Sequence, residues 1–122
     1  MNKLLGKLIL AAAALAMGNA YSHGTPVPNH GGVVQAVGET WLELVVKGDK
    51  IELYLEDDGD PMDSAGVTGT VSIAGKPGEW ALAPAGENKL VAKGKVPAGA
   101  KLTAKLLMAD KKTKVATTFA TK

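Results

Sequence analysis

The chain has 122 residues, enough for one domain and too few for two of ordinary size. With 46% hydrophobic and 21% charged residues, its composition is that of a globular protein. Cysteine is absent, which excludes disulfides, thiolate metal sites, a cysteine nucleophile and a lipid-modified cysteine. Arginine is also absent, so the bidentate contacts that read guanine or clamp phosphate are missing, and we expect no nucleic-acid partner.

Residues 1–22 have the pattern of a secretory signal peptide. Two lysines supply the positive start, and residues 8–17 form an unbroken apolar run. This run is about half the ~20 apolar residues that a membrane-spanning helix needs. The small residues that follow allow cleavage after Ala20 or after Ser22. We therefore expect export to a bacterial-type periplasm, with no membrane anchor once the signal peptide is removed.

The rest of the chain shows the alternation of apolar and polar residues that is typical of half-buried strands. The clearest cases are Thr40–Val46 and Lys50–Glu56, where leucine and isoleucine point to one side and mostly polar or aromatic residues to the other. Turn residues separate each segment from the next. The predicted strands are Val33–Val37, Thr40–Val46, Lys50–Glu56, Val67–Ile73, Glu79–Ala83, Lys89–Ala92, Lys101–Met108 and Thr113–Thr121.

Seven or eight short strands in about 100 residues predict an all-β fold, an antiparallel β-sandwich over residues 33–122. An immunoglobulin-like arrangement is the first expectation and a barrel the second. Residues 23–32 (HGTPVPNHGG) precede this domain. Their prolines and glycines oppose regular structure, so they are expected to form a flexible N-terminal leader.

We expect no enzyme. There is no cysteine, both histidines lie in the leader, and the serines are not in the context of a nucleophile elbow. No glycine-rich phosphate loop occurs. Glu52 and Glu56 are interpreted as residues on the solvent face of a strand, not as a pair of catalytic carboxylates.

His23 and His30, the only histidines, are the candidate metal ligands. Imidazole is the commonest side-chain ligand for copper, nickel and zinc. If the mature chain begins at Tyr21, its amine, two amide nitrogens and His23 can wrap Cu(II) or Ni(II). If it begins at His23, the amine and ring of this residue chelate the ion and His30 supplies a third nitrogen. The alternative is that both histidines are simply solvated.

The segment from His23 to Val33 resembles the leader of small exported proteins associated with bacterial heavy-metal resistance and efflux loci. In that leader a His-Gly pair, proline and a His-Gly-Gly segment precede the first strand. The layout of the paired strands after it, and the lysine-rich C-terminal half, are also similar. The resemblance implies metal handling with His23 and His30 as ligands, and a periplasmic subunit of a metal efflux system as a partner.

The metal itself is left open. Beyond the signal peptide only Met62 and Met108 carry sulfur, and Met108 shares the apolar face of its strand. Carriers of Cu(I) gather several thioethers, so the sequence favours Cu(II), with zinc, nickel or cobalt as alternatives.

A second functional hypothesis rests on charge. From His23 to Asp63 there are nine acidic residues and two lysines, whereas from Ser64 to Lys122 there are three acidic residues and ten lysines. The two parts either attract each other within one fold or form a docking face. In the second case the protein is a non-catalytic immunoglobulin-like interaction module that docks onto an envelope complex.

Overall fold

The computed structural model describes residues 24–121, so the predicted signal peptide and His23 lie outside the described residues. Within 24–121 we find no helix that is long and apolar enough to cross a membrane. The described chain forms nine strands: β1 (Val33–Val37), β2 (Thr40–Lys47), β3 (Lys50–Asp57), β4 (Asp60–Pro61), β5 (Thr68–Ile73), β6 (Trp80–Pro84), β7 (Lys89–Lys93), β8 (Lys101–Leu107) and β9 (Lys114–Ala120).

The predicted all-β fold is confirmed. Each of the eight predicted segments contains a strand whose ends lie within one residue of the expected ones. The ninth strand, β4, has only two residues and pairs with the end of β3. Apolar alternation could not reveal it because two residues are too few to show a period.

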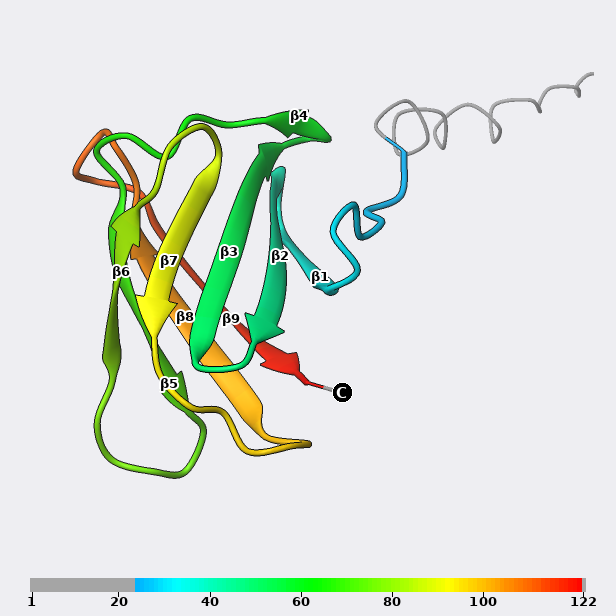
Figure 1. Ribbon diagram of the computed structural model, residues 1–122. Coiled ribbons are helices and arrows are strands. Elements are labelled where there is room, and N and C mark those ends of the chain that lie inside the picture. The colour runs from blue at the N-terminus through cyan, green and yellow to red at the C-terminus, as the bar shows by residue number, and fades with distance from the viewer. Residues whose placement is uncertain (1–23, 122) are drawn as a thin grey trace, which may run out of the picture.

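The strands form one antiparallel path in two layers (Figure 1). Neighbours along the path follow the order β1-β2-β3-β7-β6-β5-β8-β9. The first layer contains β1, β2, β3 and β7, and the second contains β5, β8 and β9. Strand β6 pairs with β5 through its first half and with β7 through its last residues, so it joins the layers. Because β1 also contacts β9, the sandwich is nearly closed, as in a barrel.

The core lies between the layers and consists of the inward-facing residues of almost every long strand. Burial of these side chains is the main force that holds the two layers together. Phe119 on β9 is the largest of the fully buried side chains. Its companions with no exposed surface are Leu42, Ile51, Leu53, Leu55, Val71, Leu90, Leu102 and Ala104.

A two-residue turn fixes how β2 and β3 pair. Gly48 adopts a positive φ of 59°, and the turn at Gly48 and Asp49 places Lys47 opposite Lys50. Positive φ values are what tight hairpin turns need, and glycine adopts them without steric cost. From this register it follows that Glu43 on β2 lies opposite Tyr54 on β3, on the outer face of the sheet.

Candidate metal site around His30

His30 lies just before β1, in a segment that is attached to the outer face of β2. The anchor is Glu43, whose carboxylate accepts hydrogen bonds from the backbone amides of Asn29 (3.0 Å), His30 (2.8 Å) and Gly32 (2.9 Å). It also accepts one from Nδ1 of the His30 ring at 2.8 Å. Sequence alone predicted a flexible leader, but its last four residues are held to the sheet by these four bonds.

Two further contacts fix this segment. Gly32 lies so close to β2 that an added Cβ would overlap the backbone carbonyl of Leu44 and lie 2.9 Å from the side chain of Val45. The side-chain amide of Asn29 donates a hydrogen bond to Glu56 at 2.8 Å. The sequence Asn-His-Gly-Gly therefore supplies two anchored polar residues and a glycine without which the backbone could not approach the sheet.

The ring of His30 is stacked on the ring of Tyr54. The ring centroids are 3.6 Å apart and the planes differ by 6°. Because Glu43 and Tyr54 are neighbours across β2 and β3, one fixes Nδ1 and the other fixes the plane of the imidazole. For His30, the alternative that both histidines are simply solvated is therefore wrong, although 40% of its side chain remains exposed.

The protonation of Glu43 decides which ring nitrogen is free. Its burial would raise the pKa, but the hydrogen bonds from His30, Gly32 and Asn29 together hold the pKa of Glu43 below its ordinary value. The ionised carboxylate can only accept, so Nδ1 of His30 must be the donor. In the neutral imidazole the lone pair then lies on Nε2, which no residue of 24–121 engages.

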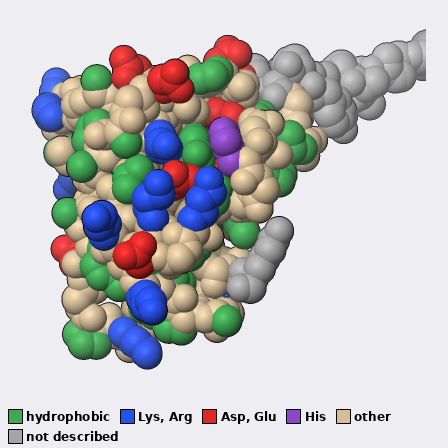
Figure 2. Space-filling view, viewed as in Figure 1, with side chains coloured by type: hydrophobic (Ala, Val, Ile, Leu, Met, Phe, Trp, Pro, Cys, Tyr) green, Lys and Arg blue, Asp and Glu red, His purple; other side chains and the backbone are tan. Residues whose placement is uncertain are grey.

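A second buried carboxylate lies on the same face. Glu52 on β3 is 2% exposed, and the ammonium groups of Lys47, Lys50 and Lys89 each lie 3.5 Å from one of its oxygens. The hydroxyl of Tyr54 donates to it at 3.1 Å. On the face seen in Figure 2, basic side chains gather around an acidic group near the histidine.

The surroundings of Glu52 differ from the solvent-facing position that the sequence predicted for it. Burial would raise the pKa of Glu52, but the Tyr54 hydrogen bond and the three lysines hold it below its ordinary value. Burial and the nearby Glu52 raise the pKa of Tyr54. Glu52 does lie on the outer face, as expected, but it is almost completely buried there, with three lysine side chains around it.

The described residues alone do not form a complete metal site. No group of three histidine, aspartate or glutamate side chains in residues 24–121 could hold an ion. The arrangement at His30 supplies one oriented nitrogen. A set of three such side chains therefore needs a ligand from outside residues 24–121, where the other predicted ligand, His23, lies, or from a second molecule.

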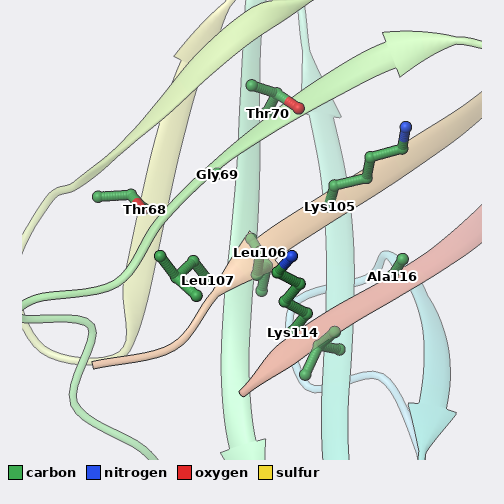
Figure 3. A pocket seen from close by; sticks show the side chains of 9 residues that line it. Thr68, Gly69, Thr70, Lys105, Leu106, Leu107, Lys114 and Ala116 are labelled. Carbon is green, nitrogen blue, oxygen red and sulfur yellow. The ribbon is translucent and has the colours of Figure 1, made fainter. Parts of the chain in front are cut away.

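An apolar hollow of about 320 Å³ lies on the other layer, on β5, β8 and β9 (Figure 3). Thr68, Thr70, Lys105, Leu107 and Ala116 are among its lining residues. No histidine or carboxylate lines it, and its titratable lining side chains are Lys105 and Lys114. The described histidine and the two buried glutamates lie instead on the first layer.

Sequence reasoning singled out His30 as a candidate but did not predict its contacts with Glu43 and Tyr54. Glu43 and Tyr54 were expected only to face outward, and nothing in the sequence pairs them with a residue of the leader. The register imposed by the Gly48 turn is the one signal that could have placed these two side chains next to each other. Comparison with protein-family models, curated proteins and solved structures finds no match to this chain.

Proposed function

We propose that this chain is a non-catalytic periplasmic protein that binds a divalent transition-metal ion through Nε2 of His30. The observation that carries the proposal is the bond between Nδ1 of His30 and the buried carboxylate of Glu43. Histidines that bind metals almost always donate their other ring nitrogen to a carboxylate or carbonyl group, which fixes the tautomer and raises the basicity of the ligand. Glu43 is the positioning residue in this arrangement.

The remaining ligands are proposed from the sequence. His23 and the new N-terminal amine lie at most ten residues before His30 for either cleavage site. Ten residues can span more than 30 Å when extended, so the chain is long enough to return to the imidazole. The resulting set of nitrogen ligands suits Cu(II) best, with zinc, nickel or cobalt as alternatives.

The positions of the methionines support nitrogen over sulfur ligation. Met108 is 8% exposed within the core, and Met62 packs against the core. The ion would therefore be held as Cu(II) or a similar divalent ion, and exchanged through imidazole ligands. In a metal resistance or efflux system, such a protein would act as a carrier, a buffer or a delivery partner.

The test is a calorimetric titration of the mature protein, purified from the periplasm, with Cu(II) and then Zn(II). The mass of the metal-free protein first establishes whether the chain begins at Tyr21 or His23. We expect one ion per chain and at least a tenfold weaker affinity for His30→Ala. An unchanged affinity in His30→Ala would show that the terminus alone binds the metal and would contradict the proposal.

Glu43→Gln and Glu52→Gln form a matched pair for the same titration. Both replace a buried carboxylate on the outer face by an amide of equal size, but only Glu43 contacts His30. Loss of a group that orients a ligand typically weakens metal binding by about 10–100-fold. We expect that loss for Glu43→Gln and little change for Glu52→Gln, whereas equal effects would remove the role assigned to Glu43.

A further inference from the structure

A row of lysines crosses the outer face of the first layer. Lys47 on β2 lies directly opposite Lys50 on β3, which in turn lies directly opposite Lys93 on β7. We call these three residues the lysine row. Like charges that face each other across strands destabilise a sheet. This arrangement therefore costs stability, and the fold alone does not account for it.

One carboxylate compensates part of this charge. Glu52 pairs with Lys47 and Lys50 of the row, and with Lys89 of β7, all at 3.5 Å. Three ammonium groups thus surround a single negative charge. Within residues 24–121, no carboxylate contacts Lys93. The surface keeps a local excess of positive charge.

The positive groups are accessible, whereas the negative group is not. The side chains of Lys47 and Lys50 are 62% and 44% exposed, and that of Glu52 is 3% exposed. Each ammonium has three donors and can accept a second anionic partner without leaving Glu52. An approaching molecule therefore meets ammonium groups before it meets Glu52.

We propose that the lysine row is a docking surface for an acidic segment of a partner protein. Charge complementarity indicates carboxylate side chains as the groups that it binds. A membrane is disfavoured because Val27, the only large hydrophobic residue strongly exposed in 24–121, lies in the leader. A nucleic acid is disfavoured because there is no arginine and His30 already stacks on Tyr54.

The docking surface lies next to His30 but does not depend on metal binding. Tyr54 contacts the His30 ring with its own ring and Glu52 with its hydroxyl, so the two regions share this residue. A partner seated on the lysine row would therefore lie beside the imidazole. The docking test uses metal-free protein. A failure to bind the peptide would leave the metal proposal standing, and a failure to bind metal would leave the docking proposal standing.

The experiment measures binding of a fluorescent deca-glutamate peptide to the whole mature protein by anisotropy, at several salt concentrations. The test variant is Lys47→Gln, Lys50→Gln and Lys93→Gln together, which leaves Lys89 on Glu52. The control variant, Lys101→Gln, Lys105→Gln and Lys114→Gln, removes the same charge from the other layer. We expect the test variant to bind roughly tenfold or more weakly, and the control about as the wild type does.

A substitution that should strengthen peptide binding provides a second test. Glu52→Gln removes the one compensating charge but keeps an oxygen that can accept from Tyr54. We expect it to bind the peptide more tightly, by about twofold or more. Equal losses in the two lysine variants would mean a general charge effect and would overturn the proposal. So would binding that is insensitive to salt, or stronger binding to phosphatidylglycerol vesicles than to the peptide.

Discussion

Glu43 on β2 and Glu52 on β3 lie on the same outer face of the sheet, and both are nearly inaccessible, at 5% and 2% exposure. Their surroundings differ. Glu43 accepts from three backbone amides and one imidazole, which are fixed donors from a single short segment. Glu52 is surrounded by three flexible ammonium groups and one hydroxyl. Glu43 therefore orders the end of the leader, whereas Glu52 gathers lysine ammonium groups at the surface.

The largest expected difference in stability is between the variants that remove the Glu43 carboxylate and the Glu52 carboxylate. Glu43→Ala leaves the amides of Asn29, His30 and Gly32 without their acceptor, and we expect it to lower the free energy of unfolding by about 3 kcal/mol. Glu52→Ala allows its lysines to turn to water and should cost about 1 kcal/mol. Urea unfolding followed by tryptophan fluorescence measures both values. Equal losses would contradict the distinction between fixed and flexible donors.

Substitution of Gly32 is a second way to loosen the leader from β2. In Gly32→Ala the new methyl group overlaps the carbonyl of Leu44, so we expect a loss of about 2 kcal/mol. Gly31→Ala is the control, because a Cβ there meets nothing and only its positive φ of 77° adds strain, about 1 kcal/mol. Hydrogen exchange of the His30 amide should quicken clearly in the first variant. If exchange is equally slow in both, close packing of Gly32 does not hold the segment.

Low pH should reduce the stability that Glu43 and Glu52 contribute to the fold. The pKa values of Glu43 and Glu52 are lower in the folded protein than their ordinary value of 4.5. Their contribution to stability is therefore fully present above pH 4.5 and is lost as the pH falls through the lower folded values. Urea midpoints measured from about pH 7 to pH 3 should decline below the ordinary value. The decline should be shallower in Glu43→Gln, and an identical pH profile would argue against a lowered pKa at Glu43.

The smallest expected effect concerns the residue that the two sites share. Tyr54→Phe keeps the ring that stacks on His30 but removes the hydroxyl that donates to Glu52. We expect a loss of less than about 1 kcal/mol in stability, an unchanged metal affinity and an upward shift of the Glu52 pKa. Carboxyl-carbon NMR titration measures that shift. A large loss of metal affinity would mean that the hydroxyl, and not the ring, supports the imidazole.

The strands were predictable because their pattern is local. Alternation over five to eight residues places Leu53 inward and Tyr54 outward without any knowledge of partners. The order of the strands was not predictable, since β3 pairs with β7 and β5 with β8 across long stretches of chain. The burial of Glu43 was equally hidden, because it depends on amides 11 to 14 residues away. His30 was proposed as a ligand from its residue type alone, but its orientation arises only from the folded sheet.

The central claim is that Glu43 presents Nε2 of His30 to a metal ion, and nitrogen-15 NMR of the imidazole tests it most directly. The spectrum is recorded at a pH where the ring is neutral, before and after addition of Zn(II). We expect Nδ1 to carry the proton in the metal-free protein, and Zn(II) to move the Nε2 resonance while the proton on Nδ1 stays. A proton on Nε2 in the metal-free protein, or an Nε2 resonance that Zn(II) does not move, would contradict it.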